Sequence, residues 1–179
     1  MRPSSPELAE AFSAGVTSNG TNVIRIGLAS TDMLYFAAGS KNLPGAMFTA
    51  SHNPAAYNGI KLCLSGARPI GKETGLLTIE NFVRNGMPIA MRPPGTETHE
   101  DLLAAYADHL HKLVTFKGNR PLKIVIDAGN GMGGYTAPAV FERLNAEVVE
   151  LYFELDGTFP NHEANPIEPA NLVDLQKAV

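Results

Sequence analysis

The chain has 179 residues, of which 18 are Asp or Glu and 14 are Lys or Arg, so its formal charge at pH 7 is −4. This weak acidity excludes a generally basic nucleic-acid-binding protein, and we expect no nucleic-acid partner. No uninterrupted apolar run exceeds six residues, far short of the roughly 20 that span a bilayer, so we also expect no membrane partner.

The first half of the chain predicts alternating helices and strands. The Ser4-Ser5-Pro6 run carries cap and first-turn signals for a helix that ends at Gly15 or Gly20. The next expected elements are a strand over residues 22–29, a helix over 31–39 opened by Thr31 or Asp32, strands over 46–50 and 59–64, and a helix over 71–85. The Pro-Pro-Gly cluster within residues 89–96 predicts an interdomain linker.

The second half predicts a further helix followed by a strand-helix-strand unit. Apolar residues at one helical face predict a helix over residues 99–114, and these are Leu102, Leu103, Tyr106, Leu110 and Leu113. Strands are expected over 123–127 and 147–153, with a glycine-rich turn at 129–134 and a helix over 136–145 between them, and residues 172–179 begin a last element. This alternation is typical of an α/β fold. We predict a first domain over residues 1–97 and a second over 98–179.

The cysteine content bears on the cellular compartment. Cys63 is the only cysteine, so no disulfide can form within the chain, and the N-terminus lacks the apolar core of a secretory signal. Both features favour a reducing compartment, and we predict a cytoplasmic location. Cys63 itself is interpreted as a small packed residue. The sequence leaves the oligomeric state open.

The charges are unevenly distributed along the chain. Residues 41–72 contain four Lys or Arg and no carboxylate, whereas residues 142–174 contain eight carboxylates and one arginine. A basic stretch in an acidic protein is typical of a site for a small anion such as a phosphate. A solvated surface with chance clustering explains the same pattern equally well.

The segment that carries chemistry is Thr-Ala-Ser-His-Asn-Pro at residues 49–54, followed by Tyr-Asn-Gly-Ile-Lys at 57–61. If the two flanking strands pair as a hairpin, Ser51 ends one strand and Lys61 starts the other, so both lie at the same mouth of the loop. A serine hydroxyl becomes nucleophilic when a base takes its proton or a cation stabilises its anion, and His52 and Lys61 are both within reach. The structural alternative is a serine that caps a turn before Pro54, with a solvated lysine.

The same segment resembles the active-site serine loop of the α-D-phosphohexomutases, the phosphomannomutase and phosphoglucomutase family. Further runs resemble the rest of that family's first domain and the start of its second. These runs are residues 4–8 (SSPEL), 27–32 (GLASTD), 44–48 (PGAMF), 127–134 (DAGNGMGG) and 156–162 (DGTFPNH). The resemblance implies α/β domains of the phosphohexomutase type, each with a mixed sheet in an α/β/α arrangement.

The resemblance also implies the chemistry. Ser51 would be the phosphoserine, which gives a phosphoryl group to a hexose 1- or 6-phosphate and takes the other phosphoryl group back from the bisphosphorylated sugar. His52 and Lys61 would transfer protons or stabilise phosphate, in an order that stays open. Mg²⁺ would be held by a phosphoryl oxygen on Ser51 and by three aspartates of an Asp-Gly-Asp-x-Asp-Arg loop. That loop does not occur in this sequence.

Other segments of the family are missing as well. The sequence lacks the family's Tyr-Asp-x-Arg-Gly segment, its Gly-Glu-x-Ser-Gly-His sugar-recognition loop and its C-terminal phosphate-binding domain. The resemblance therefore implies a truncated chain, with part of domain 1 and the start of domain 2. We expect the full-length parent to be an intramolecular phosphotransferase and this polypeptide to have no appreciable mutase activity. Mannose or glucose specificity stays open, because the discriminating loop is absent.

Two alternatives remain at this point. The first is a non-catalytic module that binds phosphosugars with its serine loop. Less favoured is a dinucleotide-binding domain, based on Gly129-x-Gly131-x-x-Gly134 between a strand and a helix with Glu150 about 20 residues on. Asp127 argues against it, because its carboxylate lies where a pyrophosphate would bind.

Overall fold

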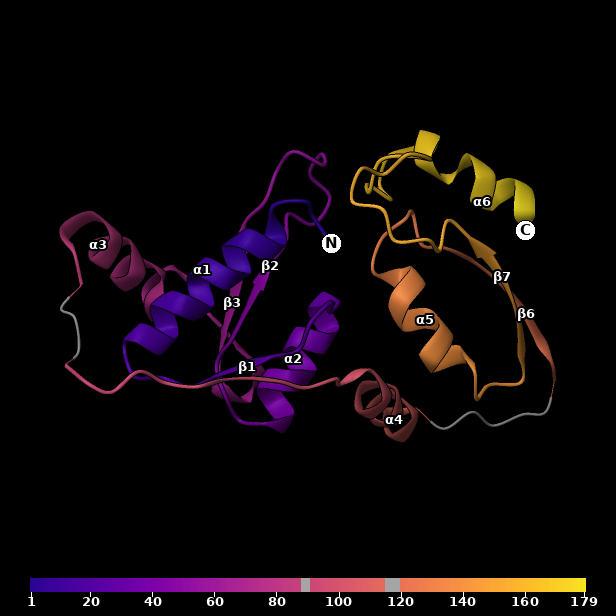
Figure 1. Cartoon of the computed structure of the whole chain (residues 1–179). Helices are drawn as coiled ribbons and strands as arrows, with labels where there is room; N and C mark the ends of the chain where they lie inside the picture. Colours follow the sequence, from indigo (N-terminus) through magenta and orange to yellow (C-terminus); the bar gives the residue numbers. More distant parts are fainter. Residues whose placement is uncertain (88–90, 115–119) are drawn as a thin grey trace.

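The computed structural model describes residues 1–87, 91–114 and 120–179. Figure 1 shows two lobes, with α1 to α3 in the first and α4 to α6 in the second. The elements are α1 (Ser5–Ser18), β1 (Val23–Arg25), α2 (Thr31–Ser40), β2 (Gly45–Phe48), β3 (Ile60–Leu64), a 3₁₀ turn (Ser65–Ala67), β4 (Arg68–Pro69), a π-type turn (Lys72–Leu76), α3 (Leu77–Asn85), β5 (Glu97–His99), α4 (Leu103–Leu113), β6 (Leu122–Asp127), α5 (Gly133–Phe141), β7 (Ala146–Leu151), a 3₁₀ turn (Pro169–Leu172) and α6 (Val173–Ala178).

The first lobe has helices on both faces of an antiparallel sheet in the order β2-β3-β4. Successive side chains of a strand point to opposite faces, so Met47 and Phe48 of β2 face different helices. Phe48 packs edge-on against Phe12 of α1, with ring centroids 5.8 Å apart. Met47 packs with Leu34 of α2 and with Cys63 of β3, which is 2% exposed. The α/β/α arrangement and the packed cysteine that the sequence predicts are both confirmed.

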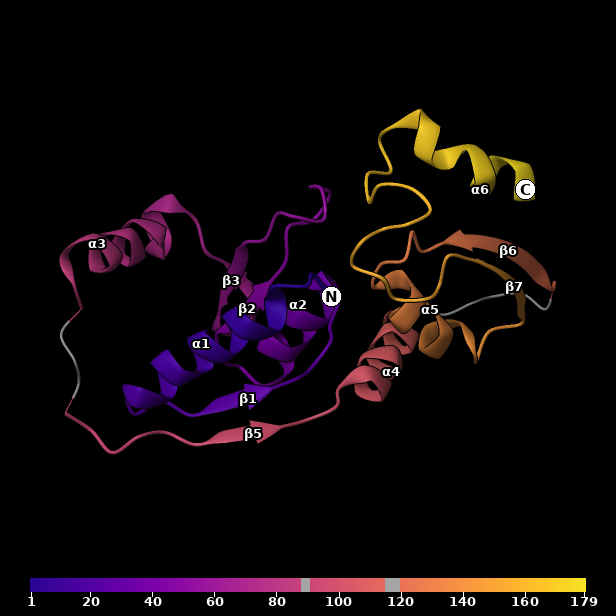
Figure 2. The same cartoon turned by 45° about the horizontal axis from the view of Figure 1, so that its top comes forward.

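Strand β5 is the main element that the sequence did not predict. It pairs in parallel with β1, and Val23, Ile24 and Arg25 lie opposite residues 97, 98 and 99 (Figure 2). The predicted strand over residues 22–29 is correspondingly short, because three exposed or half-buried residues form a strand only where this distant partner reaches them. Strand β5 straddles the predicted domain boundary between residues 97 and 98. Of the predicted linker, residues 89 and 90 lie outside the described residues.

The helix boundaries follow local chemistry, with one correction. Helix α2 begins at Thr31, one of the two predicted starts, but its cap is Ser30, whose hydroxyl accepts the hydrogen bond from the Met33 amide at 3.3 Å. The predicted helix over residues 71–85 is broken at Gly75, whose φ of 155° is not helical, and only α3 is regular. A glycine can adopt this conformation without a Cβ clash, which explains the break.

The second lobe is a strand-helix-strand unit, as predicted. Strands β6 and β7 are parallel, with residues 122–127 opposite 146–151, and α5 connects them. Helix α5 begins at Gly133, three residues before the predicted start. Helix α4 packs on α5 with Tyr106 and Ala107 buried, whereas Leu113 is 66% exposed and does not belong to the buried face that its spacing predicted.

Aromatic side chains join the two lobes. The Phe36 ring of α2 lies 5.9 Å from the Tyr106 ring and 5.1 Å from the His109 ring of α4. Beside them the Lys41 ammonium forms an ion pair with Glu100 at 2.6 Å. In the part of the chain that the structure describes, no helix is long and apolar enough to cross a membrane.

Candidate active site

The serine loop, residues 49–59, joins β2 to β3 at one end of the antiparallel sheet. Met47 lies opposite Lys61 and Phe48 lies opposite Ile60, and the Thr49 amide donates to the Gly59 carbonyl at 3.0 Å. The predicted hairpin is therefore present, although β2 ends at Phe48 and Ser51 lies in the loop rather than at the end of the strand. The hairpin brings Ser51 and Lys61 to the same mouth of the loop.

Ser51 has a backbone conformation that residues other than glycine rarely adopt. Its φ is 48°, in the left-handed region, and the residue is exposed. Its Oγ lies 3.3 Å from Nδ1 of His52, and its amide donates to the Thr49 hydroxyl at 3.4 Å. Non-glycine residues held at positive φ cost about 1–3 kcal/mol each and concentrate at functional sites. The turn thus presents a serine hydroxyl to solvent with an imidazole nitrogen next to it.

A cleft of about 490 Å³ opens beside this hydroxyl. Ser51 and Lys61 both line it, together with Tyr35, Thr49 and Asn53, whereas His52 is not among its lining residues. Among residues 1–87, 91–114 and 120–179, the Lys61 ammonium has no hydrogen bond or ion pair, and because Lys61 lines the cleft the ammonium is available to an anion. Of the three predicted site residues, Ser51 and Lys61 share the cleft, and His52 lies beside the serine.

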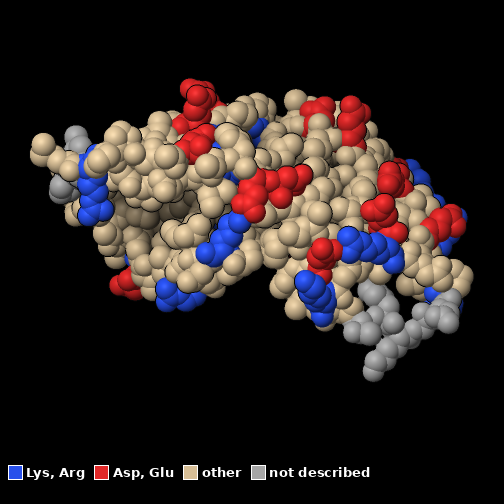
Figure 3. Space-filling model, turned by 60° about the horizontal axis from the view of Figure 1, so that its bottom comes forward, with Lys and Arg blue, Asp and Glu red and all other residues tan. Residues whose placement is uncertain are grey.

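The locally basic stretch does not form one continuous basic surface. Lys41 is neutralised by Glu100, and the Arg68 guanidinium donates to the Ser65 carbonyl at 3.3 Å. On the face drawn in Figure 3, basic and acidic side chains lie next to one another. An anion-binding role therefore rests on Lys61 in the cleft rather than on the summed charge of the stretch.

Three residues at the start of the chain support the serine loop, and the sequence analysis did not identify them. The Arg2 guanidinium donates to the carbonyls of Ser51 (2.8 Å), Asn53 (2.7 Å) and Pro54 (2.5 Å). The Asn58 amide donates to the hydroxyls of Ser4 and Ser5 at 2.9 and 3.0 Å. No spacing in the sequence signals these contacts, because they join segments about 50 residues apart.

The residues present do not build a magnesium site by themselves. Mg²⁺ prefers octahedral oxygen ligands and is held through carboxylates and substrate phosphates. Across the described ranges, no group of three or more His, Cys, Asp or Glu side chains could hold a metal ion. Ser51 stays the one candidate ligand from the sequence analysis.

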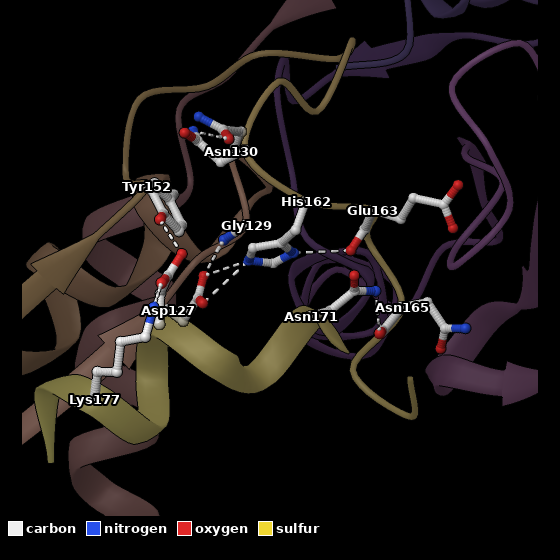
Figure 4. A network of polar contacts seen from close by, with 11 residues as sticks. Asp127, Gly129, Asn130, Tyr152, His162, Glu163, Asn165, Asn171 and Lys177 are labelled. Atoms are coloured by element: carbon white, nitrogen blue, oxygen red, sulfur yellow. Dashed lines mark hydrogen bonds and ion pairs between the residues drawn. The ribbon is translucent and has the colours of Figure 1, made fainter. Parts of the chain in front are cut away.

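A second polar network lies at the carboxyl ends of β6 and β7 (Figure 4). Nε2 of His162 lies 3.0 and 3.1 Å from the two carboxylate oxygens of Asp127, and Nδ1 lies 2.9 Å from the Glu163 carbonyl. Burial lowers the pKa of His162, but the Glu163 carbonyl and the Asp127 carboxylate outweigh burial, so the pKa is raised. Both ring nitrogens face acceptors, and only the imidazolium can donate to both.

This network explains the glycine-rich turn. A Cβ on Gly134 would lie 2.0 Å from the Phe153 carbonyl oxygen, so the turn and the segment after β7 touch through their backbones. A Cβ on Gly129 would lie 3.0 Å from Cε1 of His162, whose ring covers the turn. The glycines serve close packing within the protein, and the place of a pyrophosphate is taken by an imidazole and the Asp127 carboxylate. The dinucleotide-binding alternative is therefore not favoured.

Comparison with known proteins decides the family. Residues 1–88 match the family model for phosphoglucomutase/phosphomannomutase alpha/beta/alpha domain I, and residues 104–179 match that for domain II. The chain belongs to the phosphoglucomutase/phosphomannomutase family. A phosphoglucomutase of Neisseria gonorrhoeae is 41% identical over 99% of this chain and 38% of its own length, and a phosphomannomutase of Salmonella typhimurium is 37% identical over 100% and 41%.

A solved structure of the same family agrees with this membership. The phosphoglucomutase/phosphomannomutase family protein of Burkholderia thailandensis superposes with a TM-score of 0.82 at 34% sequence identity, over 99% of this chain and 39% of its own. The chain thus spans about two fifths of the length of the relatives that it matches. The family resemblance predicted from the serine loop and the runs around it is confirmed.

Proposed function

We propose that Ser51 is the phosphoryl carrier of a phosphohexomutase that interconverts hexose 1-phosphate and hexose 6-phosphate through a bisphosphorylated sugar. The observation that carries this proposal is the shared cleft: the exposed Ser51 residue and Lys61 line one cavity of about 490 Å³. Membership in the phosphoglucomutase/phosphomannomutase family supports the reaction class. The whole parent protein would carry out turnover, at the predicted cytoplasmic location.

Ser51, His52 and Lys61 have different roles in the step that phosphorylates Ser51. When a hexose bisphosphate approaches, the bond from Ser51 Oγ to phosphorus forms and the bond from that phosphorus to the sugar oxygen breaks. The proton of the Ser51 hydroxyl goes to Nδ1 of His52, which is its neighbour at 3.3 Å. The sugar oxygen leaves with a proton from solvent. Lys61 offsets the negative charge on the phosphoryl oxygens from within the cleft.

Ser51 is the proposed point of contact between this chain and Mg²⁺. A phosphoryl oxygen on Ser51 would be one ligand, and bound Mg²⁺ would offset charge on the transferred group. The described residues contribute no carboxylate cluster that completes its coordination. We therefore expect this polypeptide alone to show no appreciable turnover in a coupled assay of hexose 1-phosphate with bisphosphate and Mg²⁺ present.

The direct test is phosphorylation of the full-length parent, which would supply the magnesium ligands that the described residues lack. Incubation with glucose 1,6-bisphosphate, followed by intact-mass measurement and peptide mapping, should place one phosphoryl group on Ser51. Ser51→Ala should abolish the mass increase, and Ser40→Ala, which removes an exposed serine at the end of α2, should leave it unchanged. Phosphate on another residue, or none on the folded parent, would refute the assignment.

The non-catalytic alternative makes a different prediction. A phosphosugar-binding module would bind glucose 1-phosphate without taking up a phosphoryl group. NMR titration should show binding that weakens as salt rises, because screening reduces the attraction of Lys61 for phosphate. Lys61→Ala should weaken it, whereas Lys72→Ala, an exposed lysine outside the cleft, should not. Equal affinity for neutral glucose would contradict an anion site at Lys61.

A further inference from the structure

Arg2 is an almost fully buried cation against the inner side of the serine loop. It is 6% exposed, and its guanidinium donates three hydrogen bonds, to the carbonyls of Ser51, Asn53 and Pro54. A planar guanidinium has five N–H donors in a fixed fork, a geometry that a lysine ammonium cannot reproduce. Figure 1 shows the N-terminus next to the loop between β2 and β3. One side chain thus satisfies the carbonyls of three of four consecutive residues.

Arg2 donates to the Ser51 and Asn53 carbonyls, which receive no bond from the loop's own backbone among the described residues, whereas the Pro54 carbonyl also accepts from the Tyr57 amide. Between β2 and β3 the backbone contributes bonds from the Asn53 amide to the Ala50 carbonyl and from the Tyr57 amide to the Pro54 carbonyl, both at 3.0 Å. The positive φ of Ser51 turns its carbonyl toward Arg2 and its hydroxyl to the exposed side. A carbonyl left without a donor in a buried place destabilises that conformation.

The opposite side of Arg2 is covered by the second lobe. Its guanidinium carbon lies 5.1 Å from the centroid of the Phe159 ring, within the range of a cation–π contact. Next to it the backbones touch, because a Cβ on Gly157 would lie 2.4 Å from the Met1 carbonyl oxygen. The loop after β7 therefore closes over the guanidinium and excludes water from it.

We infer that Arg2 is a positioning residue for phosphoryl transfer: through three loop carbonyls it holds the left-handed turn that presents the Ser51 hydroxyl, and Phe159 of the second lobe holds Arg2 in place. The inference rests on the proposed function of Ser51. Because Arg2 is buried behind the loop and does not line the cleft, it acts on the serine and not on the bound sugar phosphate. The second lobe thereby sets the geometry of a residue in the first.

The test compares Arg2→Lys, Arg2→Ala and Phe159→Leu in the whole 179-residue chain. The control is Arg84→Ala, which removes an exposed arginine paired with Glu80 on α3. Amide hydrogen exchange, read by NMR, should rise at least about tenfold at Asn53 and Tyr57 in Arg2→Ala, because hydrogen bonds to a charged donor are lost. Exchange in β6 and β7 should stay at the wild-type rate. Arg2→Lys should restore only part of the protection, and Phe159→Leu should lie between wild type and Arg2→Ala.

Phosphoryl uptake and ligand affinity are measured separately from hydrogen exchange, so that the proposals for Ser51 and for Arg2 can fail independently. In the full-length parent, the rate of phosphoryl uptake from glucose 1,6-bisphosphate should fall at least about tenfold in Arg2→Ala, while the affinity for glucose 1-phosphate stays within about twofold of wild type. If the wild type takes up no phosphoryl group but Arg2→Ala still loosens the loop, the role of Ser51 is refuted and the loop contact of Arg2 stands. Wild-type exchange and uptake in Arg2→Ala would overturn the inference, as would a loss of affinity as large as the loss of rate. If Arg2→Ala does not fold, Arg2→Lys and Phe159→Leu decide in the same way.

Discussion

Replacing His162 by glutamine should make the chain less stable, and the loss should depend on pH. The imidazolium of His162 donates to Asp127 at 3.0 Å and to the Glu163 carbonyl at 2.9 Å, and the Asp127 side chain is 7% exposed. Glutamine is neutral and cannot donate in both directions with this geometry. A hydrogen bond to a charged group contributes about 1.5–3 kcal/mol, so we expect a loss in that range where His162 is charged.

The sign of the pH effect follows from the raised pKa of His162. Burial opposes the charged form, but the Glu163 carbonyl and the Asp127 carboxylate raise the pKa above its ordinary value. A group whose pKa is higher in the folded state stabilises the fold fully below its unfolded value of about 6.5 and loses that contribution as pH rises through the folded value. The difference between wild type and His162→Gln should therefore be largest in acid and smaller in base.

Urea unfolding followed by far-UV circular dichroism measures this difference, since the chain has no tryptophan to serve as a fluorescent probe. We would compare about pH 5.5 with about pH 9, on either side of the histidine range. His99→Gln is the matched control, because the His99 side chain is 75% exposed and lies 3.9 Å from Glu97. We expect it to change the unfolding free energy by less than about 0.5 kcal/mol at either pH.

Two results would refute this reasoning. One is an equal loss of stability for His162→Gln at both pH values, which would mean that the charge of His162 contributes nothing. The other is a His162 ring that titrates below the ordinary histidine pKa when followed by NMR. Asp127→Asn provides a further check, because it removes the carboxylate that raises the pKa of His162, and the titration should move downward.

Three further predictions follow from local geometry. Ser51→Gly should have a free energy of unfolding roughly 1 kcal/mol higher than Ser51→Ala, measured by urea unfolding. The reason is that glycine adopts the positive φ at this position without strain. Gly134→Ala should destabilise the fold by more than about 2 kcal/mol, because the new Cβ would clash with the Phe153 carbonyl. Gly15→Ala is the contrast: a Cβ at this position in α1 meets nothing, and the better helix former should stabilise the fold by about 0.5–1 kcal/mol. Thermal unfolding measures both changes. Cys63, at 2% exposed, should react with a thiol reagent only as fast as the fold opens, and immediate labelling of the native chain would contradict its burial.

Elements with strong local signals could be predicted from the amino-acid sequence. Periodicity and turn chemistry predicted α1, α2, the strand-helix-strand unit of β6, α5 and β7, and the hairpin that brings Ser51 and Lys61 together. These predictions succeed because cap residues, alternation and glycine turns act over a few neighbouring residues. The serine loop was also found in this way, since its unusual run of residues lies between two strands.

The contacts between distant segments could not be predicted in this way, because they depend on how the folded chain packs. Strand β5 is three exposed residues with no pattern of their own, and it forms because β1 offers a parallel partner more than 70 residues away. Arg2 reaches the carbonyls of the serine loop, and His162 reaches Asp127 at the end of β6, across 49 and 35 residues. Each of these contacts joins single polar groups rather than periodic faces. Their partners are chosen by how the elements within each lobe pack, and no local sequence rule encodes that choice.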